Sequence, residues 1–317
     1  MASDADDPEI VYHYTTMDAM INMVETGSIW ATSISYLNDV SEGEHFLKLI
    51  CERLPEYRQT HKLEDDSIFD GIREKSDVAF KDRSFGLGFK GRPSVASFSQ
   101  EADSLPQWRS YCPNGNGVAV GFRVECLQRA FVGLKNDPNI SGGPRVTFGP
   151  VKYIDSSDVQ SFDNAIGTAI QAATLLAQHP AQRQGEFPPK DYFKYIIERQ
   201  ACFKKHPSFS NEREYRLIVD PVLGNDKWLE FRTSRSTLVP YVSVSIPREH
   251  SRYTGATTNL TPSTLYSPLA GRWQFIDRVV IGPTTNTTLS IQAFKSFFQK
   301  HSLHVQVVPS NVPYRDW

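Results

Sequence analysis

The sequence lacks any long hydrophobic run, although 39% of its 317 residues are hydrophobic. No window approaches the 18 or so consecutive apolar residues that a membrane-spanning helix requires. The first residues, MASDADDPE, are acidic and have neither the basic start nor the apolar stretch of a signal peptide. We therefore expect a soluble, cytoplasmic protein without a membrane partner.

The sequence also lacks an excess of charge of either sign. Lys and Arg total 34 and Asp and Glu total 36, which gives a formal net charge of −2. Bulk charge therefore predicts neither a strong polyanion binder nor an acidic tail protein, and any contact with nucleic acid would have to be local.

Cysteine is scarce and scattered, and no metal motif is present. Two pairs have helical spacing, Cys202 with His206 and His301 with His304, but neither has a partner pair at ligand spacing. His-Glu-x-x-His and Cys-x-x-Cys are both absent. These absences argue against a disulfide framework and a zinc site, so we expect a reduced compartment and no metal.

The sequence contains one match to a dinucleotide-binding motif, but the segment that follows it does not have the pattern that such a site requires. Residues 86–91, GLGFKG, satisfy G-x-G-x-x-G, but that turn must lead directly into a helix whose N-terminal amides meet the pyrophosphate. Here Arg92 and Pro93 lead into a strand-like stretch at 94–98. We interpret the motif as a glycine-rich turn.

The hydrophobic pattern indicates an α+β protein. Residues 10–14 are typical of a strand, and Thr15 to Asp18 have the spacing of a capping box that begins a helix, which Gly27 can end. An irregular stretch is expected between the strands at 94–98 and 117–124, and the end of the chain shows a strand, helix, strand pattern. Further strands are predicted at 28–33, 145–153, 211–220, 228–232, 239–246, 275–281 and 304–308, and further helices at 42–54, 158–178, 190–204 and 289–301.

The stretch 211–220, NEREYRLIVD, carries an unusual polar face. As a strand it places Glu212, Glu214 and Arg216 on one side, with the two carboxylates roughly 6 to 7 Å apart. Arg216 on the same face would keep both carboxylates ionised. Such a pattern is also typical of a solvated sheet face with cross-strand ion pairs.

Two other stretches carry polar or aromatic residues that a plain sheet does not need. In the first, His13 shares a strand face with Thr15; in the second, Ser97-Phe98-Ser99 is followed by an aromatic segment with Trp108, Arg109 and Tyr111. A structural histidine and ordinary core or loop-anchoring aromatics are the alternative interpretations.

Together these stretches resemble the ADP-ribosyltransferase superfamily, whose motifs are a first-strand His or Arg, a middle Ser-x-Ser or Tyr and a late Glu. The sequence is more closely similar to an uncharacterised bacterial family whose motifs are present here as Tyr12 to Thr15, Leu37 to Asp39, Ser104, Gln107 to Tyr111, and Glu212 to Arg216. His13 matches the His-first branch of the superfamily, whereas the Ser-x-Ser and Glu-x-Glu elements match the Arg-first branch.

The resemblance implies roles for these residues. Glu214 would be the catalytic carboxylate, Glu212 the carboxylate on the acceptor side, and His13 would contact a ribose of NAD. Tyr111, Phe98 or Trp108 would stack on the nicotinamide. The full set of residues expected to bind NAD is His13, Tyr14, Thr15, Ser97, Phe98, Ser99, Trp108, Arg109, Tyr111 and Arg216.

The resemblance also implies a fold and an activity. We expect a disordered acidic tail at 1–9 and one domain at 10–317, with a split, mostly antiparallel sheet and helical insertions at about 42–85 and 157–205. The expected activity is NAD-dependent transfer of ADP-ribose to an unknown protein or nucleic acid, as in bacterial toxins or anti-phage effectors. The alternatives are a non-catalytic module that binds NAD or ADP-ribose, and an NAD glycohydrolase.

Overall fold

A computed structural model of the chain describes residues 8–37, 44–63, 93–112, 115–136, 145–178, 189–220, 228–234, 237–245 and 275–313. Three features predicted from the sequence lie outside these ranges: the first seven residues of the acidic tail, the turn at 38–39 and the glycine-rich stretch at 86–91.

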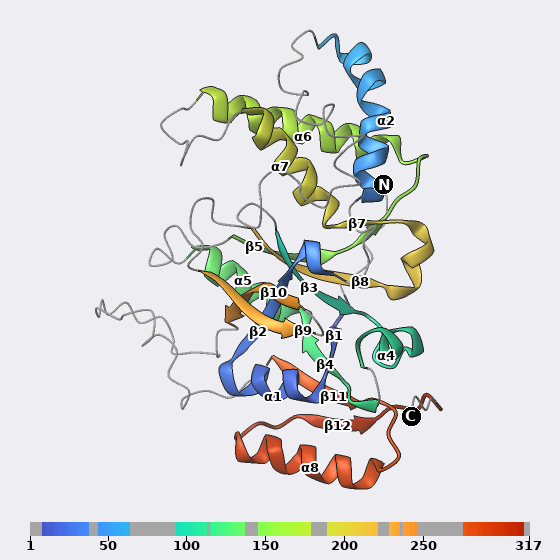
Figure 1. The fold of residues 1–317 in the computed structure, drawn as a ribbon, viewed down its shortest axis with the longest axis vertical. Coiled ribbons are helices and arrows are strands. Elements are labelled where there is room, and N and C mark those ends of the chain that lie inside the picture. Colours follow the sequence, from blue (N-terminus) through green and yellow to red (C-terminus); the bar gives the residue numbers. More distant parts are fainter. Residues whose placement is uncertain are drawn as a thin grey trace, which may run out of the picture.

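Helices and strands are interspersed along the chain (Figure 1). The strands are β1 (Ile10–Thr15), β2 (Ser28–Ser33), β3 (Ser94–Ser99), β4 (Val118–Arg123), β5 (Val146–Pro150), β6 (Lys152–Tyr153), β7 (Lys204–Lys205), β8 (Glu214–Val219), β9 (Leu229–Ser234), β10 (Thr237–Ser245), β11 (Ile276–Ile281) and β12 (Gln306–Pro309). The α-helices are α1 (Met17–Thr26), α2 (Glu44–His61), α4 (Leu105–Tyr111), α5 (Val124–Asn136), α6 (Val159–Gln178), α7 (Pro189–Ala201) and α8 (Thr287–Lys300). Two 3₁₀ helices used below are η1 (Ile34–Tyr36) and η6 (Pro207–Glu212).

A ten-stranded sheet forms the centre of the molecule. Its main path runs β12-β11-β4-β1-β3-β2-β10-β9, and β8 joins β3 to β5. All pairs in this sheet are antiparallel except β11 with β12. The prediction of mixed α and β structure with a mostly antiparallel sheet is therefore confirmed.

The sheet divides at β3. Along one edge, β3 pairs with β8 over its whole length, from Ser94 to Ser99. The other edge is shared, because β2 pairs only with Ser94 and Val95, and β1 pairs only with Ser99. In the described residues, 96–98 therefore have no strand partner on that edge, and their backbone groups must be satisfied in another way.

Helix α1 connects the two strands that share this edge. Thr16 caps its start by accepting a hydrogen bond from the Ala19 amide at 3.3 Å, and Gly27 ends it with a left-handed φ of 76°. The end at Gly27 agrees with the sequence prediction, whereas the capping residue is Thr16 and not Thr15, the first residue of the predicted capping box. The buried side chains Met20 and Met23 join the main core beneath the sheet.

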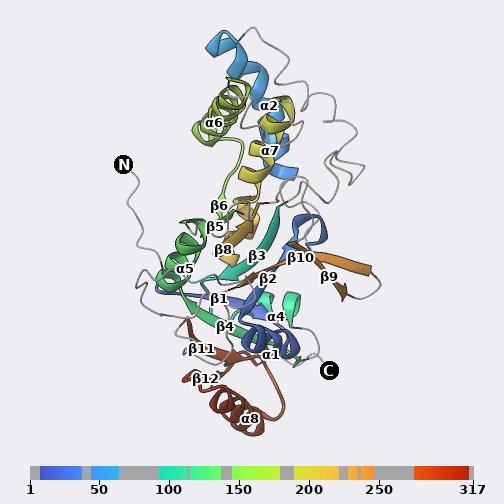
Figure 2. The same cartoon turned by 90° about the vertical axis from the view of Figure 1, so that its left-hand side faces the viewer.

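The molecule contains two large and separate cores. The main core lies between the sheet and the helices α1, α5 and α8. A second core joins α2, α6 and α7, which stand together at one end of the molecule, with α8 at the opposite end (Figures 1 and 2). In the described part of the chain, no helix has the combined length and apolar character to cross a bilayer.

Two helices differ from the sequence prediction. Helix α4 occupies the stretch that we expected to be irregular, with Pro106 in its first turn, where proline is tolerated. Helix α5 begins at Val124, directly after β4, and the sequence analysis gave no helix there. The sequence did not predict α4, because this short helix is stabilised by tertiary packing. It did not predict α5, because the helix follows β4 without a turn that would mark its start.

Candidate functional site

A cavity of about 730 Å³ opens where the edge of β3 is divided. Residues from both halves of the sheet, from α1 and α4, and from the 3₁₀ helices η1 and η6 line it. The lining includes these residues predicted from the sequence: His13, Tyr14, Thr15, Ser97, Phe98, Ser99, Tyr111, Glu212 and Glu214. The structure thus brings segments about 200 residues apart in the sequence, such as His13 and Glu214, to the same cavity.

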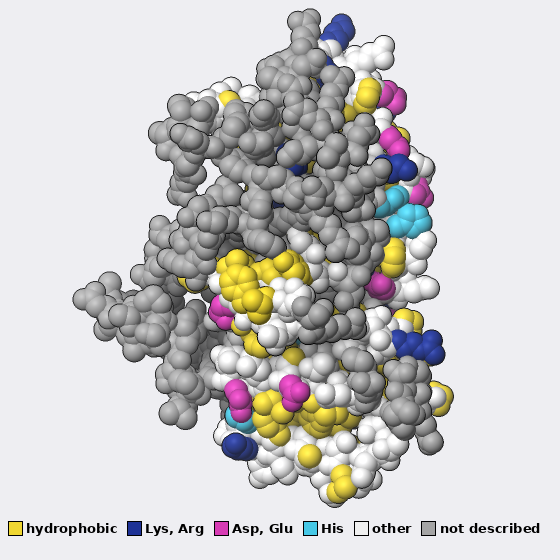
Figure 3. All heavy atoms as spheres, in the orientation of Figure 1, with side chains coloured by type: hydrophobic (Ala, Val, Ile, Leu, Met, Phe, Trp, Pro, Cys, Tyr) yellow, Lys and Arg dark blue, Asp and Glu magenta, His cyan; other side chains and the backbone are white. Residues whose placement is uncertain are grey.

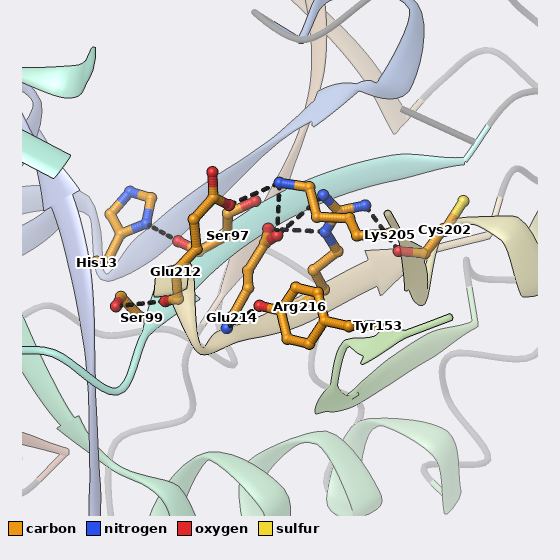
Figure 4. A network of polar contacts seen from close by, with 9 residues as sticks. All are labelled: His13, Ser97, Ser99, Tyr153, Cys202, Lys205, Glu212, Glu214 and Arg216. Atoms are coloured by element: carbon orange, nitrogen blue, oxygen red, sulfur yellow. Dashed lines mark hydrogen bonds and ion pairs between the residues drawn. The ribbon is translucent and has the colours of Figure 1, made fainter. Parts of the chain in front are cut away.

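His13 bridges the divided edge. Its Nδ1 lies 2.8 Å from the carbonyl oxygen of Ser97, so Nδ1 carries the proton and donates it to a backbone group that has no strand partner on that side (Figure 4). Burial lowers the pKa of His13, and the charge of Arg232 lowers it further against the opposing effect of this hydrogen bond. The ring is therefore neutral, with Nε2 as an acceptor.

The two serines of β3 connect this strand to the glutamates. The Ser99 hydroxyl donates to the Glu212 carbonyl at 2.7 Å and accepts from the Glu101 amide at 3.0 Å. The Ser97 side chain makes a hydrogen bond with the Glu214 carboxylate. Ser97 therefore links His13, through its carbonyl, to Glu214, through its hydroxyl.

Glu214 begins β8 and is almost completely buried. Arg216 donates to its two carboxylate oxygens at 2.7 and 3.1 Å, and Lys205 Nζ lies 3.0 Å from Oε2 (Figure 4). Burial alone would raise the pKa of Glu214, but the charges of Arg216 and Lys205 and the hydrogen bonds outweigh it, so the pKa is lowered. The carboxylate is ionised at neutral pH.

Glu212 does not lie on this strand, which corrects the sequence prediction. It ends the 3₁₀ helix η6, and Arg213 follows with a left-handed φ of 43°, so strand alternation begins only at Glu214. The two carboxylates still converge, because Lys205 Nζ lies 2.7 Å from Glu212 and 3.0 Å from Glu214. Lys205, and not Arg216 alone, therefore contacts both carboxylates.

The candidate stacking residues occupy three different environments. Tyr111 lines the cavity and is 39% exposed. The Trp108 indole is buried and donates to Asp103 Oδ1 at 2.7 Å, so it anchors α4 and does not reach the cavity wall. The Phe98 ring packs edge-on against Phe122 in the main core. Phe98 and Tyr111 both line the cavity, and of these two Tyr111 has the exposed side chain.

The two arginines predicted to bind NAD are not among the cavity-lining residues. Arg216 is completely buried, with its Nη1 donating to the Cys202 carbonyl at 2.8 Å and its other nitrogens facing Glu214. Arg109 lies on an exposed side of α4. Arg216 therefore acts on the site through Glu214.

Tyr14 and Thr15 meet the cavity at the end of β1. The Tyr14 hydroxyl donates to the Glu101 carbonyl at 2.8 Å and accepts from the Ser104 amide at 2.9 Å. This ties the start of α4 to β1, so the principal role of Tyr14 is to position the wall that carries Tyr111.

Several lining residues with polar or aromatic side chains were not predicted from the sequence, among them Trp30, Tyr36, Lys205 and Arg232. Each lies in a short segment that carries no motif. Pro207 after His206, followed by serines and an asparagine, is the local signal that could have identified the 3₁₀ helix near Lys205. Across the described ranges, no three His, Cys, Asp or Glu side chains gather closely enough to hold a metal ion.

Comparison with known proteins gives one family and one solved structure. Residues 107–217, from α4 to β8, match the family described as "Protein of unknown function (DUF2971)". No curated protein matches the chain. The chain is similar to the Thermus sp. 2.9 DarT in complex with ADP-ribosylated ssDNA, with 8% identity over 98% of this chain and 97% of that chain and a TM-score of 0.33. A TM-score of this size does not establish a shared fold.

Proposed function

We propose that the protein is an NAD-dependent ADP-ribosyltransferase. The observation that carries this proposal is the convergence of His13, Ser97 and Glu214 from three strands on one cavity, where Ser97 links the other two. These residues follow the order of the superfamily motifs that the sequence resembles. The cavity is of the size that binds a nucleotide-sized ligand.

The chemistry of this reaction matches what the site offers. Breakage of the bond between nicotinamide and the ribose C1′ leaves an oxocarbenium-like sugar, while the bonding electrons depart with nicotinamide. An ionised Glu214 would accept a hydrogen bond from a ribose hydroxyl and stabilise the developing positive charge. Neutral His13 would accept a hydrogen bond from a second hydroxyl through Nε2, and Tyr111 would face the nicotinamide ring.

Glu212 would serve the acceptor. Its side chain is 30% exposed, whereas that of Glu214 is 5% exposed, so Glu212 is the carboxylate that an incoming group can reach. The acceptor nucleophile would form a new bond to C1′ and give its proton to Glu212. A protein side chain and a nucleic acid base are both acceptors of this kind, and water in their place would give an NAD glycohydrolase.

One observation favours a second function, a non-catalytic module that binds NAD or ADP-ribose. Arg216 and Lys205 both contact the Glu214 carboxylate, and their charges reduce the electrostatic stabilisation that it can give to a cationic transition state. A binding module would retain the cavity and the polar contacts without turnover.

Nicotinamide release distinguishes these functions. The protein is incubated with NAD, and nicotinamide and ADP-ribose are quantified by chromatography. A transferase releases nicotinamide and, in cell lysate with labelled NAD, places the label on protein or nucleic acid. A glycohydrolase releases nicotinamide with free ADP-ribose as the labelled product. Binding of NAD by calorimetry without nicotinamide release in buffer or lysate identifies the binding module, and absence of both binding and release contradicts the proposal.

Glu214→Gln tests the catalytic carboxylate. We expect nicotinamide release to fall by about 10² to 10³-fold, the usual loss when one preorganised electrostatic contact to a transition state is removed. Because Glu214 is buried between two cations, this variant also loses stability, so circular dichroism must verify its fold. Glu214→Asp keeps the charge, and we expect at least a tenfold loss in a folded protein. Glu125→Gln, on the exposed surface of α5, is the matched control. Full activity in a folded Glu214→Gln variant would contradict the assignment.

A further inference from the structure

Arg232 is a cation of the cavity wall without a carboxylate partner among the described residues. Its guanidinium donates from Nη2 to the Thr32 hydroxyl at 2.9 Å and lies over the Trp30 ring, 5.8 Å from the ring centre. Its Nε is buried and has no hydrogen-bond partner among the described residues. Lys205, another cation of the lining, is in contrast paired with two glutamates.

The nearest acidic side chain on the same strand is engaged elsewhere. Glu230 lies two residues before Arg232 on β9, and its carboxylate accepts a hydrogen bond from the Tyr241 hydroxyl at 2.8 Å. Burial lowers the pKa of Arg232, against an opposing effect of Tyr241. A buried guanidinium donor without an acceptor costs free energy, which an anionic ligand would recover.

The strand register places Arg232 on the same sheet face as Glu214. Arg232 pairs with Val239 on β10, Tyr241 pairs with Thr32 on β2, and Thr32 pairs with Val95 on β3. Ser97, two residues after Val95, contacts Glu214 from this face. The face runs through the cavity, with Glu214 at the β8 end and Arg232 at the β9 end.

The opposite face of the same strands carries two exposed hydrophobic side chains near their connected ends. Phe231 and Leu238 are 60% and 59% exposed, and hydrophobic side chains gather over β9 and β10 on the surface seen in Figure 3. Strand alternation therefore directs Arg232 inward and its apolar neighbours outward. In this inward position Arg232 contacts the Trp30 ring and the Thr32 hydroxyl, and these contacts leave its charge without a carboxylate partner among the described residues.

A second unsatisfied polar atom lies in the same cavity. The Asn22 side-chain oxygen, on α1, is buried and has no hydrogen-bond partner in the described part of the chain. Arg232 and Asn22 thus each have one buried side-chain atom that no described residue satisfies. A nucleotide carries anionic groups and hydrogen-bond donors, so it offers partners of both kinds.

We propose that Arg232, flanked by Trp30 and Thr32, is the subsite for the diphosphate of a nucleotide ligand. A guanidinium binds phosphate oxygens through paired N–H donors, and among the hydrogen bonds to described residues Arg232 uses only Nη2. This inference rests on the proposed function for the identity of the nucleotide as NAD. The diphosphate of NAD lies beyond the ribose whose C1′ faces Glu214, which is consistent with separate ends of one cavity.

Calorimetric titration of the full chain tests the subsite with three ligands: ADP-ribose, inorganic pyrophosphate and adenosine. The variants are Arg232→Gln, Arg232→Lys and, as the control, Arg129→Gln on the exposed surface of α5. We expect Arg232→Gln to weaken ADP-ribose and pyrophosphate binding at least tenfold and to leave adenosine binding unchanged. Arg232→Lys keeps the charge and should lie between wild type and Arg232→Gln, and Arg129→Gln should bind like the wild type.

The outcomes separate this subsite from the proposed function. ADP-ribose binding that is equal in the wild type and in folded Arg232 variants overturns the subsite and leaves the proposed function intact. Pyrophosphate binding that depends on Arg232, without ADP-ribose or NAD binding, supports the subsite and contradicts the proposed function. A wild type that binds neither ADP-ribose nor pyrophosphate overturns the subsite. Binding of a short single-stranded oligonucleotide that depends on Arg232, with no binding of ADP-ribose, assigns the phosphate to nucleic acid and also overturns it.

Discussion

At the scale of residues, the main feature is a buried ionic cluster. Glu214 and Arg216 are two positions apart on β8, and Lys205 reaches both Glu214 and Glu212. Glu214, Arg216 and Lys205 are buried and have lost most of their contact with water, and their mutual attraction replaces it only while all three are present. The cluster therefore makes the geometry of the site depend on the ionisation of Glu214.

The lowered pKa of Glu214 sets the direction of this dependence. Its folded-state pKa lies below the ordinary value of 4.5, so the unfolded chain binds more protons between the two values. The contribution to stability is present above about pH 4.5 and is lost as the pH falls through the folded-state pKa.

Removal of one cation should expose the cost of the buried cluster. We expect Arg216→Met to lower the free energy of unfolding by about 3–5 kcal/mol, because Glu214 would keep a buried charge with one cation fewer. Arg213→Met is the matched control: Arg213 is 58% exposed and pairs with Glu101, so its loss should cost at most about 1 kcal/mol. Urea unfolding measures both, and equal losses would contradict a special role of the cluster.

At the scale of elements, the end of α4 and the start of β4 approach more closely than side chains normally permit. A Cβ on Gly117 would lie 2.0 Å from the Cys112 Cβ and 3.0 Å from its Cα. The Gly282 amide donates to the Gly117 carbonyl at 2.9 Å, so the backbone at Gly117 cannot move away freely. This close approach positions α4, which carries Tyr111 to the cavity.

Gly117→Ala should therefore displace α4 or destabilise the fold. We expect a loss of about 1–3 kcal/mol, the usual cost of overpacking, together with weaker NAD binding. In Gly149→Ala the nearest atom to the new methyl group, on Phe203, is 3.9 Å away, so this control should bind NAD like the wild type. Thermal unfolding and calorimetry check both variants, and a neutral Gly117→Ala would show that the segment adapts.

At the scale of the whole molecule, the helical end and the sheet have separate cores. The helices α2, α6 and α7 bury their apolar faces against one another. Helix α7 leads almost directly into β7, which carries Lys205. The helical end is therefore packed independently of the sheet but is connected through the chain to the glutamates of the site.

A cavity in the helical core should loosen that end and leave the main core unchanged. We expect Ile166→Ala to destabilise the helical core by about 2–5 kcal/mol, since Ile166 is completely buried. Hydrogen exchange should rise in α2, α6 and α7 and stay unchanged in β4 and β11. Val159→Ala, at a position 42% exposed on the same helix, is the control. A uniform rise across all elements would show that the molecule unfolds as one unit.

The sequence by itself determined the elements whose causes are local. Thr16 and Gly27 set the limits of α1 through capping and a left-handed turn, and the apolar alternation in β8 follows from the side chains of that strand alone. The polar residues that line the cavity, His13, Ser97, Ser99, Glu212 and Glu214, were also identified from their motifs. The limits of α1 and the alternation in β8 depend on interactions between neighbours in the chain, whereas the cavity residues were identified by their resemblance to known motifs.

Tertiary structure decided which side chains face the cavity. Because Arg213 has a left-handed backbone, Glu212 lies outside the strand. Trp108 is buried by the packing of α4. The pairing of β8 with β3 places Arg216 next to Glu214 in the interior. Lys205 and Arg232 joined the site from segments without a motif. Strand register and burial depend on contacts between distant segments, and local sequence does not specify which distant segment a strand edge will meet.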